Sequence, residues 1–376
     1  MIKDKPKKYL FYFSKDNQSH ITSLIPSEYR HKFLFGMFVP KRNQKYKLSN
    51  LQKHDVKSLK NKEKYLVLDS KYEGFSTIYK SPKLDKIYSL LDYWDISPSQ
   101  TIYVTMNMNE QKNIEEYASE NNRKPIDVYS KPFSILEIVD KKLIKANSAK
   151  RLKKIKQKVV SKSNNQHIFL NLNNRQRTYR SNFAFYLASG NVKDYMIQTH
   201  REKYVPDQEF IDRTNRTLQQ AEDWSKKETP LEYDYNITTN PELYYTTFFE
   251  VVGETLQEDW KGTSRELSEK TFRPISLMQP FLIYGQKGCN HYLKELGFKT
   301  YDEWFNLSFD LINDPVERMI SLNEEIEKTV RLLNHMTLKE KIEWRFKNQE
   351  LLIHNYECLI KLAQDIGYDT YMYFCT

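Results

Sequence analysis

Cysteine, glycine and long apolar runs are scarce in this chain of 376 residues, and each scarcity excludes a class of protein. The three cysteines, Cys289, Cys358 and Cys375, are scattered and form no CxxC pair, which argues against a disulfide scaffold or a zinc ribbon. Nine glycines exclude collagen-like and glycine-linker architectures. No apolar run approaches the roughly 20 residues of a membrane helix. The N-terminus has no apolar core of a signal peptide, so we expect a cytoplasmic protein.

Three nucleotide-binding motifs are also missing. The chain has neither a GxGxxG motif nor a Walker loop, which argues against a dehydrogenase or a P-loop NTPase. No Asp-x-Asp pair is present, although enzymes that hold a nucleotide diphosphate through a metal usually need such paired carboxylates.

Positive charge, in contrast, is abundant and unevenly placed. The formal net charge is +10, yet residues 141–180 hold 13 Lys and Arg and no acidic residue. The first 180 residues carry +20 and the remainder −10. A block of this sign and size predicts a polyanionic partner, and a solvated lysine-rich surface is an equally good interpretation.

Short β-branched or aromatic runs alternate with helix-like stretches, which predicts an α/β fold. The expected strands of the first half are Tyr9–Phe13, Tyr65–Leu68, Thr101–Thr105 and Ile126–Tyr129, with helices at Asp85–Tyr93 and Glu110–Asn121. A second alternation has strands at His167–Leu172, Tyr195–Thr199, Thr247–Val252 and Pro280–Tyr284, with helices at Arg180–Ala188, Glu269–Met278 and His291–Leu296.

The acid-free stretch 141–165 suggests a joint between two domains. We expect one domain at 1–150, a second at 151–312 and helices at 313–376 that pack across the joint. Asp314 and Thr337 read as helix N-caps, the second with a capping box, and the helix after Thr337 is expected to run to about Ala363.

The most informative stretch for chemistry is 268–285, SEKTFRPISLMQPFLIYG, a loop that feeds a helix and then a buried strand. A helix start favours an anion, because its N–H groups and its dipole attract negative charge. Lys270 and Arg273 add full charges there, and Glu269 is able to accept hydrogen bonds from a ribose. The alternative is an amphipathic helix with a capping acid and two solvated bases.

This stretch resembles the donor-site signature of GT-B glycosyltransferases, which have a (T/S)EK element, a helix and a following strand. Three flanking segments strengthen the resemblance to phage-encoded relatives: Glu250–Leu256 (EVVGETL), Gly297–Tyr301 (GFKTY) and the arginine-rich turn Asn171–Arg180. A late His354–Asn355 pair fits as well. The resemblance covers roughly 165–356 and implies two Rossmann-like domains that face a cleft. It implies that 1–150 is the acceptor-binding domain and that 151–312 is the nucleotide-sugar donor domain.

The resemblance implies an enzyme that moves a sugar from a nucleotide diphosphate, expected to be a UDP-sugar, onto a hydroxyl group. Without Asp-x-Asp, cationic side chains are expected to neutralise the leaving diphosphate, with no essential metal. The implied donor-binding residues are Arg175, Arg177, Arg180, Glu254, Ser268, Glu269, Lys270 and Arg273. Guanidinium groups suit bidentate phosphate contacts, although surface arginines that contact water or the acceptor are the alternative.

An inverting transfer needs a general base, which in this architecture comes from the N-terminal domain. Asp69 ends an expected strand and Glu73 follows one short turn later, so both are candidate catalytic residues. Asp16 and His20 compete with them, and turn or cap roles are the alternative for Asp69 and Glu73.

The expected acceptor is a hydroxymethylated pyrimidine in phage DNA, in the host cytoplasm. The charge map favours DNA, because residues 41–64 hold nine Lys and Arg against two acids. The candidate DNA-binding residues are Lys41, Arg42, Lys45, Lys47 and Lys53. Two alternatives stay open: a glycan or lipid-linked sugar as acceptor, and a non-catalytic nucleic-acid-binding protein.

Overall fold

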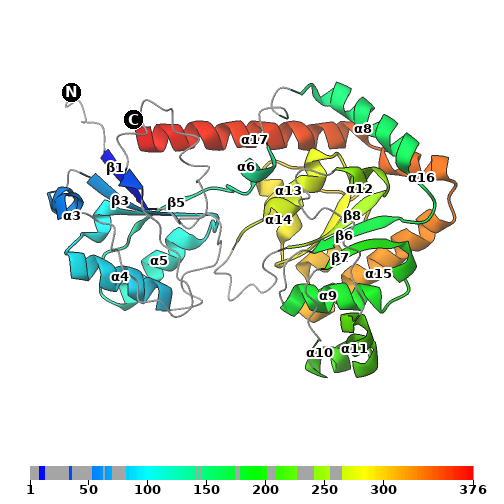
Figure 1. The fold of residues 1–376 in the computed structure, drawn as a ribbon, viewed down its shortest axis with the longest axis horizontal. Coiled ribbons are helices and arrows are strands. Elements are labelled where there is room, and N and C mark those ends of the chain that lie inside the picture. Colours follow the sequence, from blue (N-terminus) through cyan, green and yellow to red (C-terminus); the bar gives the residue numbers. More distant parts are fainter. Residues whose placement is uncertain are drawn as a thin grey trace. The chain divides into compact units, whose positions relative to one another are not determined.

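The computed structural model describes residues 8–12, 34–35, 53–61, 64–69, 82–139, 143, 146–173, 178–200, 206, 208–226, 241–254 and 265–375 (Figure 1). The chain divides into two compact units. Unit 1 comprises Met1–Leu136, Asp259–Glu266 and Leu362–Thr376. Unit 2 comprises Glu137–Glu258 and Leu267–Lys361. Each unit is built on a parallel β-sheet with helices, so the expected α/β class is confirmed.

The sheet of unit 1 has the strand order β2-β1-β3-β4-β5, and its described pairs are all parallel. The strands are β1 (Lys8–Tyr12), β2 (Leu34–Phe35), β3 (Lys64–Asp69), β4 (Thr101–Thr105) and β5 (Asp127–Ser130). The chain runs outward from β1 to β2, and then in the opposite direction from β3 to β5. The strand order therefore reverses between β1 and β3, where open α/β sheets bind ligands at the strands' carboxyl ends.

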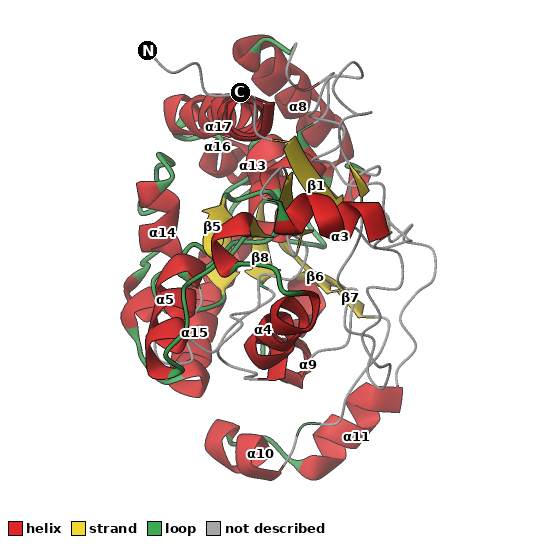
Figure 2. Ribbon diagram, turned by 90° about the vertical axis from the view of Figure 1, so that its left-hand side faces the viewer, coloured by secondary structure: helices red, strands yellow, loops and turns green. Residues whose placement is uncertain are grey.

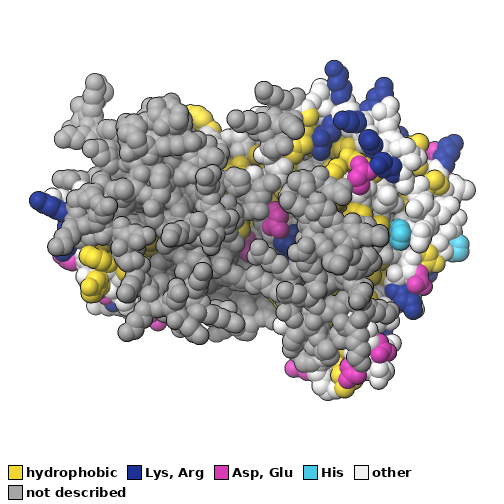
Figure 3. All heavy atoms as spheres, viewed as in Figure 1, with side chains coloured by type: hydrophobic (Ala, Val, Ile, Leu, Met, Phe, Trp, Pro, Cys, Tyr) yellow, Lys and Arg dark blue, Asp and Glu magenta, His cyan; other side chains and the backbone are white. Residues whose placement is uncertain are grey.

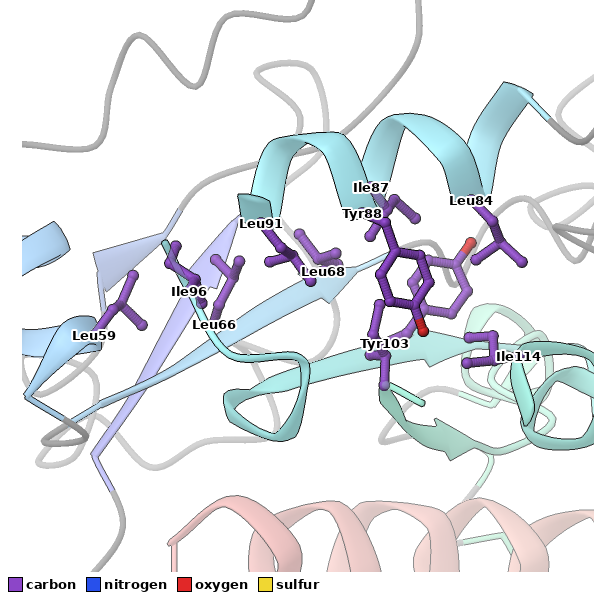
Figure 4. Packing of buried hydrophobic residues seen from close by; sticks show 11 residues of the cluster. Leu59, Leu66, Leu68, Leu84, Ile87, Tyr88, Leu91, Ile96, Tyr103 and Ile114 are labelled. Carbon is purple, nitrogen blue, oxygen red and sulfur yellow. The ribbon is translucent and has the colours of Figure 1, made fainter. Parts of the chain in front are cut away.

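The core of unit 1 forms where helix α4 (Pro82–Trp94) covers the sheet. Leu84, Ile87, Tyr88 and Leu91 recur at helical spacing, and each is at most 1% exposed. In Figure 4 these side chains pack toward the strand residues Leu66, Leu68 and Tyr103. Further helices described in residues 53–139 are α3 (Lys53–Lys60), α5 (Glu110–Glu120) and the short α6 (Ile135–Ile138).

The sheet of unit 2 has the order β7-β6-β8-β9, again with all described pairs parallel. Its strands are β6 (Phe169–Asn173), β7 (Met196–His200), β8 (Phe249–Gly253) and β9 (Phe281–Tyr284). The chain leaves β6 through α9 (Thr178–Ala188) and β8 through α13 (Glu269–Ser276), and these helices lie on opposite sides of the sheet (Figure 1). The strand order therefore reverses between β6 and β8.

Short helices complete unit 2 around this sheet. They are α10 (Gln208–Thr214), α11 (Leu218–Lys226), α12 (Glu242–Tyr245) and α14 (Cys289–Glu295). Helices α10 and α11 extend beyond α9 at one end of the unit, as Figures 1 and 2 both show. Gly297 follows α14 with φ +93°, the left-handed conformation that favours glycine after a helix.

The helices after Asp314 and Thr337 begin where the sequence predicts, but the last expected helix is two separate helices. Asp314 caps α15 (Pro315–Asn334), and the capping box of Thr337 and Glu340 starts α16 (Leu338–Arg345). The expectation of one helix from Thr337 to about Ala363 is wrong, because α16 ends and α17 (Gln349–Cys375) begins a few residues later. The side chain of Asn348 accepts a hydrogen bond from the N–H of Leu351 at 2.9 Å and so starts the new helix.

The lysine-rich stretch expected to be a joint is a regular helix. Helix α8 (Ser148–Lys162) runs through the expected boundary at 150/151, and its N-cap Asn147 accepts from the N–H of Lys150. Unit 2 instead begins at Glu137. Three apolar residues at helical spacing, Leu152, Ile155 and Val159, hold α8 in place, since each is buried.

Candidate functional site

The candidate site lies in unit 2 at the carboxyl ends of β6 and β8, where the strand order reverses. Arg180 follows β6 on α9, and Glu254 is the first residue after β8. Both are 2% exposed, and the Nε of Arg180 donates to the backbone carbonyl of Glu254 at 3.0 Å. The hydrogen bond joins the two elements that flank the reversal point, which is the ligand-binding position of doubly wound sheets.

The Glu254 carboxylate joins the end of β8 to the start of α13. Its two oxygens accept from the backbone N–H of Ser268 at 3.1 and 3.2 Å. Its Oε1 also accepts from the Thr271 hydroxyl at 2.5 Å. A charged acceptor makes these hydrogen bonds stronger than neutral ones, so Glu254 holds the first turn of α13 in place.

The first turn of α13 presents an acid and a base side by side. Ser268 is the N-cap, and its hydroxyl oxygen accepts from the N–H of Lys270. The Lys270 Nζ lies 2.7 Å from Glu269 Oε1, with 15% of the lysine side chain and 32% of the glutamate side chain exposed. Both charged groups are therefore partly exposed at a helix start, next to a dipole that attracts anions.

At this turn the positive charges of Lys270 and Arg180 act on each other. Burial lowers the pKa of Lys270, the ion pair with Glu269 raises it, and the charge of Arg180 lowers it again, which leaves the pKa below its usual value. Burial alone raises the pKa of Glu269, but Lys270 outweighs this effect and holds that pKa below its usual value. An anion bound here offsets the repulsion between Lys270 and Arg180.

Arg273, which the sequence predicts as a donor contact, points into the core. Its guanidinium is 2.9 Å from Glu250 Oε1 and also donates to the Tyr244 hydroxyl. Glu250 and Tyr244 are 0% exposed, and Arg273 is 6% exposed. Burial raises the pKa of Glu250, and Arg273 opposes that effect. Arg273 therefore fastens α13 to β8.

Close packing at the end of β9 supports the same edge of the sheet. A Cβ atom on Gly285 would lie 2.8 Å from Cys289 Sγ, closer than real Cβ contacts, and 3.0 Å from the Glu254 Cβ, which is a tight contact. The backbone carbonyl of Gly285 accepts from the Arg318 Nε at 3.2 Å. Only glycine therefore allows Glu254 and α14 to approach β9 this closely.

The structure brings together five of the donor-binding residues expected from the sequence: Arg180, Glu254, Ser268, Glu269 and Lys270. Thr271, Glu250 and Tyr244 were not expected. The position of Thr271 in the sequence, one turn after the N-cap Ser268, could have indicated its role. From there its hydroxyl donates to the Glu254 carboxylate.

Several expected site residues cannot be placed. Glu73, Arg175, Arg177, Lys41, Arg42, Lys45 and Lys47 lie outside the described residues. Only the backbone is described for Asp69, which ends β3 next to the reversal point of the first sheet, and for Lys53, which begins α3.

Comparison with family models, with curated proteins and with solved structures finds no match to this chain. Within the described ranges, no group of three or more His, Cys, Asp and Glu side chains is arranged to hold a metal ion. A separate search of the same ranges finds no helix with the length and apolar character needed to cross a membrane.

Proposed function

We propose that the chain is a glycosyltransferase that moves a sugar from a nucleotide diphosphate donor onto a hydroxyl acceptor. The two parallel sheets, each with one reversal of strand order, support a GT-B arrangement of two Rossmann-like domains. The proposal also rests on the resemblance of the 268–285 stretch to the donor signature of that class.

The observation that carries the proposal is that Glu254 joins the two elements that bear Arg180 and Lys270, at the reversal point of the second sheet. The positive charge of Arg180 lowers the pKa of Lys270, so the two cations act on each other across the start of α13. Perturbed titratable groups at a ligand-binding edge are typical of functional sites. A diphosphate there would receive two cations and the dipole of a helix.

In this proposal Lys270 contacts the diphosphate, the buried Arg180 adds its positive charge beside it, and Glu269 accepts hydrogen bonds from the ribose. Glu254 and Ser268 position the helix start that carries these groups. Cationic side chains stabilise the charge that develops on the leaving diphosphate, which is the role that a metal plays in other enzymes. Arg175 and Arg177 are proposed as further diphosphate contacts, and Asp69 and Glu73 as candidate bases.

The donor proposal is tested by calorimetry with UDP, GDP and ADP, and by a hydrolysis assay with their sugar conjugates. We expect one nucleotide diphosphate to bind, and Lys270→Met to weaken it by about tenfold to a hundredfold, because a charge-assisted hydrogen bond is lost. Lys294→Met is the matched control, since Lys294 is exposed on α14. The proposed donor site would be contradicted if none of the three nucleotides binds, or if both variants lose the same affinity.

The proposed acceptor is a hydroxymethylated pyrimidine in DNA, a proposal that rests on the phage-type resemblance and on the basic N-terminal half. Incubation with hydroxymethylcytosine-containing DNA and a donor mixture, followed by nucleoside mass spectrometry, tests it. Transfer to a saccharide with no sugar on DNA would favour the glycan alternative. DNA binding without any nucleotide binding would favour a non-catalytic nucleic-acid-binding protein.

A further inference from the structure

Helix α8 carries the densest positive charge among the described elements. Its sequence, SAKRLKKIKQKVVSK, holds seven Lys and Arg in 15 residues and no acid. The space-filling view shows these blue side chains gathered over α8 at the upper right (Figure 3). Such a density on one helix repels itself unless an external anion neutralises it.

The inner side of α8 is already occupied. Leu152, Ile155 and Val159 are at most 4% exposed. Arg151 donates to the backbone carbonyl of Ser276, and Lys162 pairs with Glu242. No continuous apolar face therefore remains on α8 for insertion into a lipid bilayer, which membrane-surface helices require.

The outer side of α8 is a row of lysines. Lys150, Lys153 and Lys154 are exposed, and Lys158 is partly exposed. Within the described part of the chain, none of these four lysines forms an ion pair. Neighbours three or four residues apart are about 5–6 Å apart on a helix. The row extends along a helix about 22 Å long.

We propose that this lysine row, defined as Lys150, Lys153, Lys154 and Lys158, is a docking surface for the phosphodiester backbone of duplex DNA. Phosphates follow one another at short, regular intervals along a duplex, and lysines bind them as point charges without reading sequence. Lys150, Lys154 and Lys158 recur every four residues, and this repeat favours such a partner over an acidic protein segment, whose charges have no fixed repeat. The inference needs no donor chemistry, so it stands or fails separately from the proposed function.

The test is fluorescence anisotropy of a labelled 20-base-pair duplex with the full chain, in NaCl from 50 to 200 mM and without a nucleotide. The row variant combines Lys150→Gln, Lys153→Gln, Lys154→Gln and Lys158→Gln. The matched control removes the same charge elsewhere in unit 2, through Lys287→Gln, Lys294→Gln, Lys299→Gln and Lys328→Gln. Glutamine keeps helix propensity close to that of lysine, and the melting temperature of each variant checks that it is folded.

We expect the row variant to bind at least about tenfold more weakly at 100 mM NaCl, and its salt dependence to be shallower by up to about 3.6 in the slope of log K against log salt, because four phosphate contacts are lost. The control variant should lose much less affinity for the duplex. Equal losses in the two variants would show a general charge effect and overturn the proposal. So would an unchanged row variant, no binding by the natural chain, or binding of phosphatidylserine vesicles in place of DNA.

Discussion

The backbone N–H of Ser268 lies within 3.2 Å of both carboxylate oxygens of Glu254, a residue 14 positions earlier in the chain. The contact fixes the start of α13 to the end of β8, although the segment between them leaves unit 2 at Asp259 and returns at Leu267. The geometry of the Lys270 and Glu269 side chains therefore depends on one buried carboxylate.

The first prediction concerns this carboxylate. Glu254→Gln should lower the free energy of unfolding by about 1–3 kcal/mol, because a buried N–H and a buried hydroxyl lose a charged acceptor. Urea denaturation followed by circular dichroism measures the loss. Glu343→Gln is the control, since the Glu343 side chain is 62% exposed in a long ion pair with Lys339. A loss no larger than that of the control would contradict the role of Glu254.

The second prediction concerns the buried pair of Arg273 and Glu250. Arg273→Met should cost about 3–5 kcal/mol, because it leaves the charge of Glu250 buried without its cation. Adding Glu250→Leu should recover much of this loss, since both charged groups are then absent. If the loss of unfolding free energy in the double variant equals the sum of the losses in the two single variants, the ion pair does not couple these residues.

The pH dependence of the Arg273→Met variant provides a separate check. Burial already raises the pKa of Glu250, and loss of Arg273 raises it further, so the folded variant binds a proton more tightly than the unfolded chain. The stability deficit should therefore be smallest near pH 4.5 and should grow as the pH rises to 7. A deficit that does not change with pH would show that Glu250 is not the group left unpaired.

The third prediction concerns Gly285. Gly285→Ala should lower the free energy of unfolding by about 1–3 kcal/mol, because the new methyl group clashes with Cys289 Sγ and with Glu254. Combining it with Cys289→Ala should recover only part of the loss, since the Glu254 contact at 3.0 Å remains. Thermal unfolding of both variants and of Cys289→Ala alone measures this. Full recovery would show that Glu254 does not limit the space at Gly285.

Much of the fold is readable from local patterns. The expected strand Thr101–Thr105 matches β4 at both ends, because a run of β-branched and aromatic residues between polar ones has few other stable conformations. The cap at Asp314 is equally plain, with proline at the first helical position. The two-residue strand β2 was not predicted, since so short a pairing depends on its neighbour rather than on its own sequence.

The site shows why charge alone is a weaker guide. Lys270 and Arg273 are both basic residues of one helix, yet one is accessible and the other is enclosed by β8 and α12. Residues from Thr271 to Ser276 are all buried, so periodicity gives no exposed face on which to place the arginine. On α8 the high lysine count alone does not predict a helix, whereas the spacing of its three buried apolar residues does.

The fourth prediction concerns the cap of α15. Asp314 Oδ1 accepts from the N–H groups of Val316 and Glu317 at 2.9 Å, and Arg213 lies 2.5 Å from the same oxygen. Asp314→Ala should lower the free energy of unfolding by about 1 kcal/mol, because it removes the cap. Asp314→Asn should cost less, since an amide oxygen also accepts these bonds.

The two variants at Asp314 should also differ in their response to pH. Burial alone raises the pKa of Asp314, but the hydrogen bonds from Glu317 and Arg213 hold it below its usual value of 3.8. A lowered carboxyl pKa contributes stability that is present above 3.8 and is lost as the pH falls through the folded value. The gap between the natural chain and Asp314→Asn should therefore close below that pH, whereas the gap between Asp314→Asn and Asp314→Ala should persist. Urea titrations at pH 7, 5 and 3 measure both differences in the free energy of unfolding. If the difference between the natural chain and Asp314→Asn widens in acid, the charge-assisted cap is contradicted.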